Sequence, residues 1–129
     1  MKSYLLETSF IIDYLKDKND AVKLLHNVNG RLTSSVICLA ELYDGVTRSN
    51  NKEQQGKLLN EFFNNLDACY AVEEEVAKKF GELRAKLKNQ GNIIEDMDLF
   101  IAATCLVYDL TLITFNKRHF AHIEDLLLL

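Results

Sequence analysis

Short apolar runs alternate with longer helical stretches along almost the whole chain, and this alternation limits the possible folds more than any other feature. Residues 3–6, 31–35, 69–72 and 110–114 have the length and composition of buried strands. The segments between them carry apolar residues at every third or fourth position. This order predicts an α/β protein, with a three-layer α/β/α fold and a short, mainly parallel central sheet.

Apolar spacing also predicts where the helices lie. Helices are expected at about residues 9–16, 20–28, 36–46, 57–66, 73–88 and 97–108. Ser9 is expected to cap the first of them. The third has Val36, Leu39, Ala40 and Tyr43 at helical spacing, which predicts that these four face inward.

Length and composition indicate one domain covering residues 1–129, with no linker or repeat. No segment approaches the roughly 18 apolar residues of a membrane span, and the N-terminus does not have the pattern of a signal peptide. We therefore expect a cytoplasmic protein without membrane contact. The three cysteines lack metal-site spacing and are expected to be inert core thiols. A formal charge of −4 argues against a protein that coats nucleic acid.

Three carboxylates stand in apolar surroundings. Glu7 directly follows the first predicted strand, Glu41 is the only charge between residues 31 and 44, and Asp98 the only charge between residues 97 and 109. A buried carboxylate without a partner costs several kcal/mol, so such groups usually pair or bind a metal. Ligands in α/β folds lie beyond the carboxyl ends of the strands. The three acids could therefore converge there on Mg²⁺.

Each acid also has a structural explanation when taken alone. Glu41 could belong to the solvent-facing stripe of its helix, and Glu7 could pair with a lysine. Asp98, which follows two other acids, could be a helix-cap or first-turn residue favoured by the helix dipole. Asp13 lies in a helix with other charged residues and fits a surface role. From these residues alone, the chain is an α/β domain with an acidic pocket.

Four ordered segments resemble the motifs of the PIN domain family, most closely the VapC toxins of toxin–antitoxin pairs. "YLLETSFIIDYL" resembles the opening motif, with Glu7 at the position of its acid. "SSVICLAELYDGV" resembles the second motif, whose Glu matches Glu41. "DMDLFIAATCL" resembles the third, with Asp98 at the metal-site position and Asp96 beside it. "LTLITFNKRHF" resembles the closing motif, with Asn116 after the strand.

This resemblance implies a Mg²⁺- or Mn²⁺-dependent endoribonuclease that acts on RNA, forms a homodimer and is inhibited by a cognate VapB-type antitoxin. Glu7 and Asp98 would be metal ligands, Glu41 a ligand or water-orienting group, and Asn116 a neutral helper. The residues expected to support them are Asp96, Thr8, Ser9 and Thr114. The basic segment 76–88 suggests RNA-phosphate contacts by Lys78, Lys79 and Arg84, or alternatively a solvated face. Residues 57–66 are the expected dimer contact.

The chain departs from the family pattern at two positions. Glu7 stands where the family nearly always has Asp, and His119 where it often has an acid. These departures keep open a second function, a PIN-fold protein that binds RNA or an antitoxin with weak or no nuclease activity. A receiver-like signalling domain is a further alternative, but it requires a tandem acid after the first strand, and the chain offers only Asp13.

Overall fold

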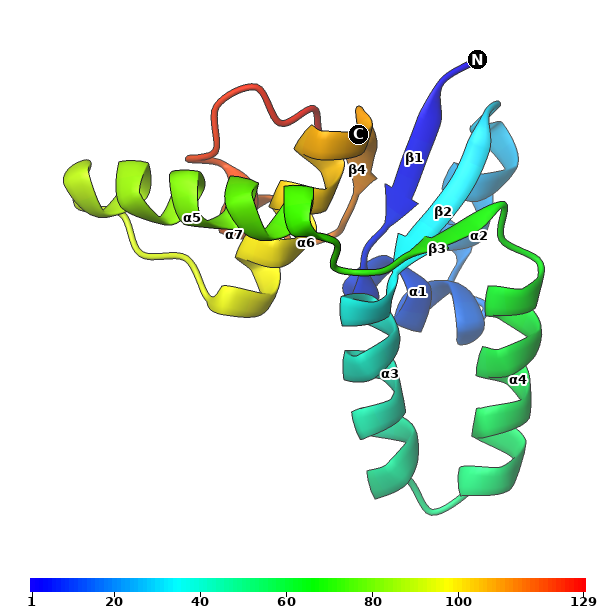
Figure 1. Ribbon diagram of the computed structural model, residues 1–129. Helices are drawn as coiled ribbons and strands as arrows, with labels where there is room; N and C mark the ends of the chain where they lie inside the picture. Colours follow the sequence, from blue (N-terminus) through cyan, green and yellow to red (C-terminus); the bar gives the residue numbers. More distant parts are fainter.

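A four-stranded sheet lies at the centre of the molecule (Figure 1). The computed structural model describes residues 1–129. The strands are β1 (Ser3–Leu6), β2 (Arg31–Ser35), β3 (Ala68–Tyr70) and β4 (Thr111–Ile113), in the spatial order β3-β2-β1-β4. All three strand pairings are parallel, which confirms the predicted α/β class.

Helices connect the strands and cover the sheet. They are α1 (Thr8–Leu15), α2 (Asn19–Asn27), α3 (Val36–Arg48), α4 (Lys52–Asn64), α5 (Glu74–Asn89), α6 (Asp96–Tyr108) and α7 (Lys117–Phe120). The predicted start of α4 near residue 57 was wrong, because residues 52–55 are good helix formers without an apolar pattern. The short α7 was not predicted. No helix combines the length and apolar character that crossing a membrane requires.

Mostly different helices cover the two faces of the sheet, which gives the predicted three layers, and α3 contributes Cys38 to one cluster and Leu42 to the other. Leu5 and Leu112 pack into one hydrophobic cluster with α5 and α6. Leu6 and Ile113 pack into a second cluster with α1, α2 and α4. Neighbouring residues of a strand point to opposite faces, so β1 contributes side chains to both clusters. Figure 1 shows α5 and α6 on one side of the sheet and α4 on the other.

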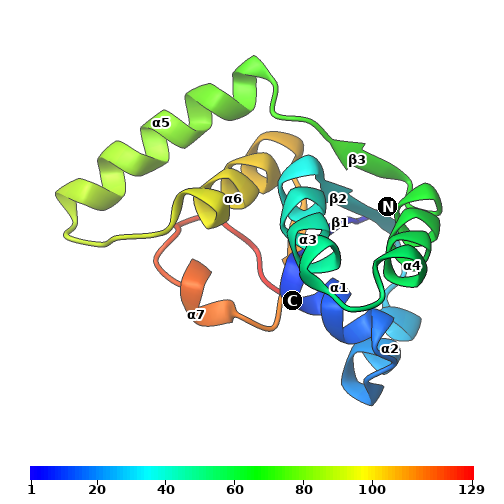
Figure 2. The same cartoon turned by 90° about the horizontal axis from the view of Figure 1, so that it is seen from below.

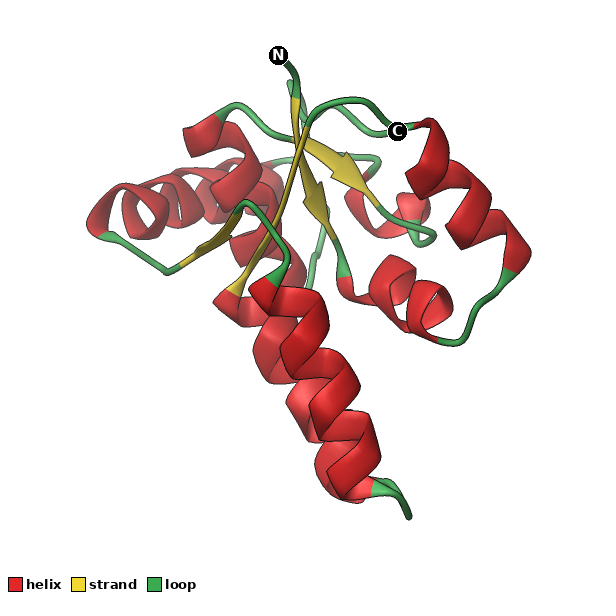
Figure 3. Ribbon diagram, turned by 90° about the vertical axis from the view of Figure 1, so that its right-hand side faces the viewer, coloured by secondary structure: helices red, strands yellow, loops and turns green.

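Helix α3 is oriented differently from the prediction. Its buried residues are Cys38 and Leu42, whereas Val36 and Tyr43 are 38% and 41% exposed and Ala40 is also exposed. Residues 36–40 are all apolar, so their spacing fits more than one helix face. Packing against α4 and α6 decides between these faces. Figures 1 and 3 show α3 and α4 extending together from the sheet.

The strand order changes direction between β1 and β4, which makes a topological switch point there. Strands β2 and β3 lie in order on one side of β1, whereas β4 lies on its other side. Ligands of open parallel sheets bind at such switch points, beyond the carboxyl ends of the strands. Glu7 follows β1 there, and its N–H donates to the carbonyl of Ile113 at 3.0 Å. Figure 2 shows α1, α3, α6 and α7 gathered around this end.

Candidate metal centre

Glu7 is held at the switch point by two hydroxyl groups. Its side chain is nearly buried, with 4% of the residue exposed. Oε1 accepts hydrogen bonds from Ser9 Oγ and Thr114 Oγ1, both at 2.5 Å. No hydrogen bond reaches Oε2, and no fully buried side-chain oxygen of this chain lacks a partner, so Oε2 meets the solvent. Glu7 therefore presents one fixed carboxylate oxygen to the surface.

The same hydroxyls connect the loop after β4 to the start of α1. Ser9 Oγ and Thr114 Oγ1 are 3.3 Å apart. The N–H of Phe115 donates to Ser9 Oγ at 3.1 Å, and the N–H of Asn116 donates to Thr114 Oγ1 at 2.9 Å. The prediction that Ser9 caps α1 was wrong: Glu7 is the N-cap residue, and the Ser9 hydroxyl bonds to the Glu7 carboxylate instead.

Glu41 reaches the same region from the first half of α3. It is partly buried, and Thr8 Oγ1 donates to its Oε1 at 2.7 Å. Partial burial raises the pKa of the Glu41 carboxyl, and the negative charges of Glu7 and Asp98 raise it further. The Thr8 hydrogen bond acts in the opposite direction because it stabilises the ionised form.

Asp98 enters from the first turn of α6. Its pKa is raised by burial and by the charge of Glu7, while the contact with His119 opposes this increase. His119 Nδ1 lies 3.2 Å from Asp98 Oδ2. The charge of Glu7 thus reaches both Glu41 and Asp98, and that of Asp98 reaches Glu41, although the three acids come from different elements.

Two neighbours of the acids were not among the predicted site residues. Glu95 raises the pKa values of both Glu41 and Asp98. It precedes Asp98 by three positions, about one helical turn. This spacing in the sequence could have indicated that Glu95 lies close to Asp98. His119, noted only as a departure from the family pattern, is the residue that contacts Asp98.

The remaining predicted residues make no side-chain hydrogen bond or ion pair with the three acids. The exposed Asp96 side chain forms an ion pair with Arg84. Asn116 precedes α7, and its side chain makes no hydrogen bond within the chain. Lys78 pairs with Glu74 at 3.9 Å, and Lys79 with Glu82 at 3.1 Å. These pairings reduce the positive field of α5, so RNA contact by this helix remains a prediction.

The donor set fits a hard divalent cation. Carboxylate oxygens suit Mg²⁺ and Mn²⁺, and a cation would relieve the repulsion between Glu7, Glu41 and Asp98. No three His, Cys, Asp or Glu side chains are grouped closely enough to ligate a single ion as they stand. Like charges repel without a cation between them. A shared ion therefore requires the Glu41 and Asp98 side chains to turn toward Glu7.

The raised pKa values predict how the stability of the metal-free protein depends on pH. Between the unfolded pKa values near 4 and the raised folded values, the folded protein binds more protons than the unfolded chain. The stabilisation that Glu41 and Asp98 contribute is therefore complete below about pH 4 and is lost as pH rises through their folded pKa values.

Melting temperatures in EDTA test this dependence. The difference in melting temperature between wild type and a Glu41→Gln/Asp98→Asn variant should fall as pH rises, and saturating Mg²⁺ should reduce the change. A difference that does not vary with pH would contradict the raised pKa values of Glu41 and Asp98, whose largest cause is burial.

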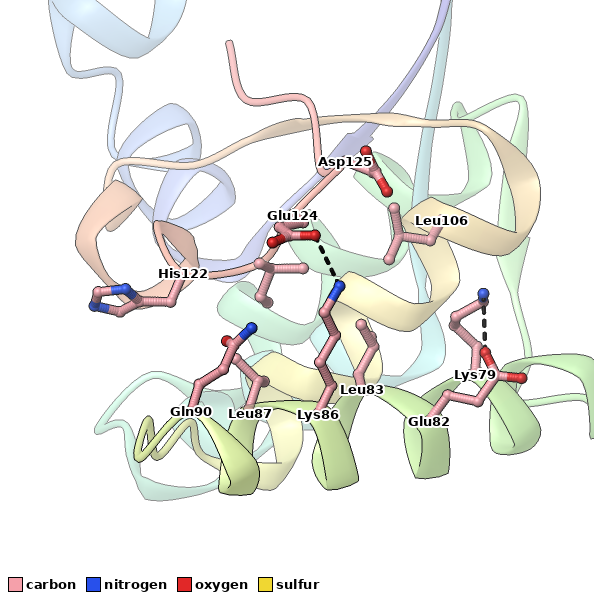
Figure 4. A pocket seen from close by; sticks show the side chains of 11 residues that line it. Lys79, Glu82, Leu83, Lys86, Leu87, Gln90, Leu106, His122, Glu124 and Asp125 are labelled. Carbon is pink, nitrogen blue, oxygen red and sulfur yellow. Dashed lines mark hydrogen bonds and ion pairs between the residues drawn. The ribbon is translucent and has the colours of Figure 1, made fainter.

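A separate pocket lies between α5 and the C-terminal segment (Figure 4). It contains none of the three acids. Its main polar contact is the Lys86–Glu124 ion pair, with Nζ 2.8 Å from Oε2, and Lys79 also pairs with Glu82 beside it. The charges of this pocket therefore largely neutralise one another.

Comparison with known proteins gives matches over nearly the whole chain. The profile of the PIN domain family matches residues 4–126. Ribonuclease VapC2 of Rickettsia felis is 33% identical over 129 residues, covering 97% of this chain and 95% of that protein. Ribonuclease VapC1 of Methanocaldococcus jannaschii is 32% identical over 121 residues, covering 94% of this chain and 81% of that protein.

Solved structures contain the same arrangement of strands and helices. A chain in the crystal structure of VapBC2 from Rickettsia felis, bound to a DNA fragment from its promoter, superimposes with a TM-score of 0.89 at 32% identity. This match covers 98% of the present chain and 96% of that chain. DNA-bound VapBC from Salmonella typhimurium contains a chain that matches with a TM-score of 0.90 at 26% identity, covering 100% and 98%.

Proposed function

Because this chain belongs to the PIN domain family, we propose that it is a metal-dependent endoribonuclease toxin of a VapBC-type toxin–antitoxin pair. Relatives that align over most of their length carry the name ribonuclease VapC. The main support for the proposal is the position of Glu7. This nearly buried acid lies at the β1–β4 switch point, where its charge raises the pKa values of Asp98 and Glu41.

In this proposal the chain's own residues hold the ion and orient the water. Glu7 Oε2 and the Asp98 carboxylate would ligate Mg²⁺ or Mn²⁺, with Asn116 as a neutral helper. When bound, the cation supplies Lewis-acid chemistry, polarising a phosphoryl oxygen and lowering the pKa of a water. Glu41, whose pKa is raised, would orient the attacking water and accept its proton.

The hydroxyl groups have a positioning role in the same scheme. Ser9 and Thr114 fix the Glu7 carboxylate through Oε1, which leaves Oε2 toward the solvent. Thr8 fixes one oxygen of Glu41. Residues that orient ligands in this way determine how well the ion and the water are placed.

The proposed partners are RNA as substrate, a VapB-type antitoxin and a second copy of this chain. Solved neighbours of this fold are VapBC complexes. For the homodimer, most apolar residues of α4 already have partners inside the protein: Leu59 is buried, and Phe62 and Phe63 pack against the second cluster. Leu58, which is 40% exposed, is the apolar residue of 57–66 left to contact a second copy.

Metal removal tests the proposed function. Purified protein treated with EDTA should lose cleavage of a mixed-sequence RNA by at least about 100-fold, because the ion supplies the electrostatic stabilisation of the reaction. Addition of Mg²⁺ or Mn²⁺ in excess should restore it. Glu41→Gln, prepared identically, is the blank for contaminating ribonucleases. Equal cleavage in EDTA and Mg²⁺ would contradict the proposal.

One observation favours the second candidate function, RNA or antitoxin binding with little cleavage. Glu7 has a longer side chain than the family's usual Asp, and no group of acids is already arranged to ligate an ion. In that case the protein would bind RNA or its antitoxin at every metal concentration without producing fragments. Fragment analysis alongside a binding assay separates the two functions.

A further inference from the structure

Phe115 is an exposed aromatic residue attached directly to the acidic site. It is 43% exposed, although it directly follows the buried Thr114. Single exposed apolar side chains are common on protein surfaces and need no explanation by themselves. Phe115 differs because its backbone N–H donates to Ser9 Oγ, and the same hydroxyl donates to the Glu7 carboxylate. Two successive hydrogen bonds therefore connect the backbone of Phe115 to the proposed metal ligand Glu7.

A second aromatic ring packs against the ring of Phe115. The buried Phe10 ring lies against it with centroids 5.6 Å apart and an interplanar angle of 41°. This contact covers part of the Phe115 ring, and the Ser9 hydrogen bond fixes its backbone. The remaining exposed surface is thus held in a defined position, as a stacking platform requires.

A hollow of about 320 Å³ adjoins this ring. The residues around it come from α1, the α1–α2 turn and α2: Asp13, Lys18, Asn19 and Asp20, with Phe115 on the remaining side. Lys18 Nζ lies 3.5 Å from Asp13 Oδ1, so its charge is already compensated. The hollow contains one cation, Lys18, and two carboxylates, Asp13 and Asp20, so binding of a phosphate there is disfavoured. Amide and carboxylate groups beside an aromatic ring suit the hydrogen-bonding edge and flat face of a nucleobase.

We propose that Phe115 stacks on an unpaired base of the RNA next to the phosphate held at the acidic site, and that the hollow receives the edge of this base. This inference rests on the proposed function, because it takes RNA as the ligand. Bases can stack on a side chain only where they are unpaired. This contact with Phe115 therefore requires a single-stranded or looped segment of the RNA, and a continuous duplex should not make it.

Fluorescence of 2-aminopurine tests the stacking without depending on cleavage. A short single-stranded RNA carrying this base is titrated in Mg²⁺ with full-length protein that carries Glu41→Gln, so that the ion is present and cleavage is suppressed. This protein should quench the fluorescence on binding. Phe115→Leu should lose the quenching and bind about 5- to 150-fold more weakly, the range for loss of one stacked base. Phe115→Tyr should retain both properties.

Matched controls separate stacking from general effects. Tyr43→Leu removes a similarly exposed aromatic ring from α3 and should leave quenching unchanged. Melting temperatures verify that each variant is folded. The same RNA annealed to its complement should bind more weakly than the single strand. Unchanged quenching and affinity in Phe115→Leu, or equal binding of duplex and single strand, would overturn the proposal.

The outcomes also separate this inference from the proposed ribonuclease activity. Quenching that depends on Phe115, without cleavage under any metal condition, would support the stacking site and count against the nuclease. Cleavage that is unaffected in Phe115→Leu would support the nuclease and overturn the stacking site. If Phe115→Leu weakens only the binding of a protein antitoxin, the ring belongs to a protein interface and the inference is wrong.

Discussion

Replacing Asp98 with asparagine is expected to reduce metal-dependent RNA cleavage at least about 100-fold and to raise the melting temperature of the metal-free protein. Loss of a residue that only orients a metal ligand already costs 10- to 100-fold, so loss of a ligand should cost at least as much. Asparagine preserves the shape of the side chain but removes the negative charge that the proposed ion requires.

The stability gain follows from the environment of Asp98. Partial burial and the nearby charges of Glu7 and Glu95 raise its pKa, so its ionised form is disfavoured in the folded protein. Loss of the favourable His119 contact offsets part of the gain. An increase in the melting temperature is therefore expected.

Cleavage assays in Mg²⁺ and thermal unfolding in EDTA measure the two effects of Asp98→Asn. Asp44→Asn is the matched control, because Asp44 is an exposed acid of α3 paired with Arg48. It should change neither activity nor stability appreciably. If Asp98→Asn lost activity and also lowered the melting temperature, Asp98 would have a structural role in place of the proposed catalytic one.

Replacing Glu7 with aspartate is expected to increase cleavage by at least about tenfold. The glutamate side chain is longer by one methylene, which moves the carboxylate by roughly the ~1.5 Å of a carbon–carbon bond. Catalytic groups tolerate errors of only about 0.5 Å, and a misplacement of about 1 Å can cost about 100-fold. The ion can therefore bind at Glu7 while the water and the phosphate remain poorly aligned.

The assay for Glu7→Asp compares initial rates of Mg²⁺-dependent cleavage with those of wild type. Glu7→Gln, which keeps the length but removes the charge, is the blank. Equal rates for wild type and Glu7→Asp would mean that the site adapts to the longer acid. A lower rate in the aspartate variant would refute the geometric argument, because the Ser9 and Thr114 hydroxyls would then require the longer side chain.

The sequence predicted the sheet and the place of Glu7 because both depend on local patterns. The strand of residues 3–6 ends directly before Glu7, and a parallel sheet brings its carboxyl end next to that of β4. The face of α3 could not be predicted in the same way. Residues 36–40 are all apolar, so their spacing does not determine which face of α3 turns toward the core. Packing against α4 and α6 determines it.

Side-chain partners distant in sequence were the least predictable part of the site. Nothing local indicates that Thr114 donates to Glu7, 107 positions earlier in the chain, or that His119 contacts Asp98. Similarly, the cations of α5 suggested an RNA-binding face, whereas Arg84 pairs with Asp96 of the next helix. Such pairings depend on the tertiary packing of whole elements, which apolar spacing does not encode.

Because the central strand β1 contributes to both hydrophobic clusters, the three acids differ in how long they keep their places when the protein opens locally. Detachment of α5 and α6 displaces Asp98 and uncovers one face of β1, whose other face stays packed in the second cluster. Helix α3 belongs to both clusters through Cys38 and Leu42, so its detachment displaces Glu41 and loosens the packing on both faces. Because partial unfolding separates cooperative units one at a time, Asp98 is expected to leave the site in an opening that keeps Glu7 in place.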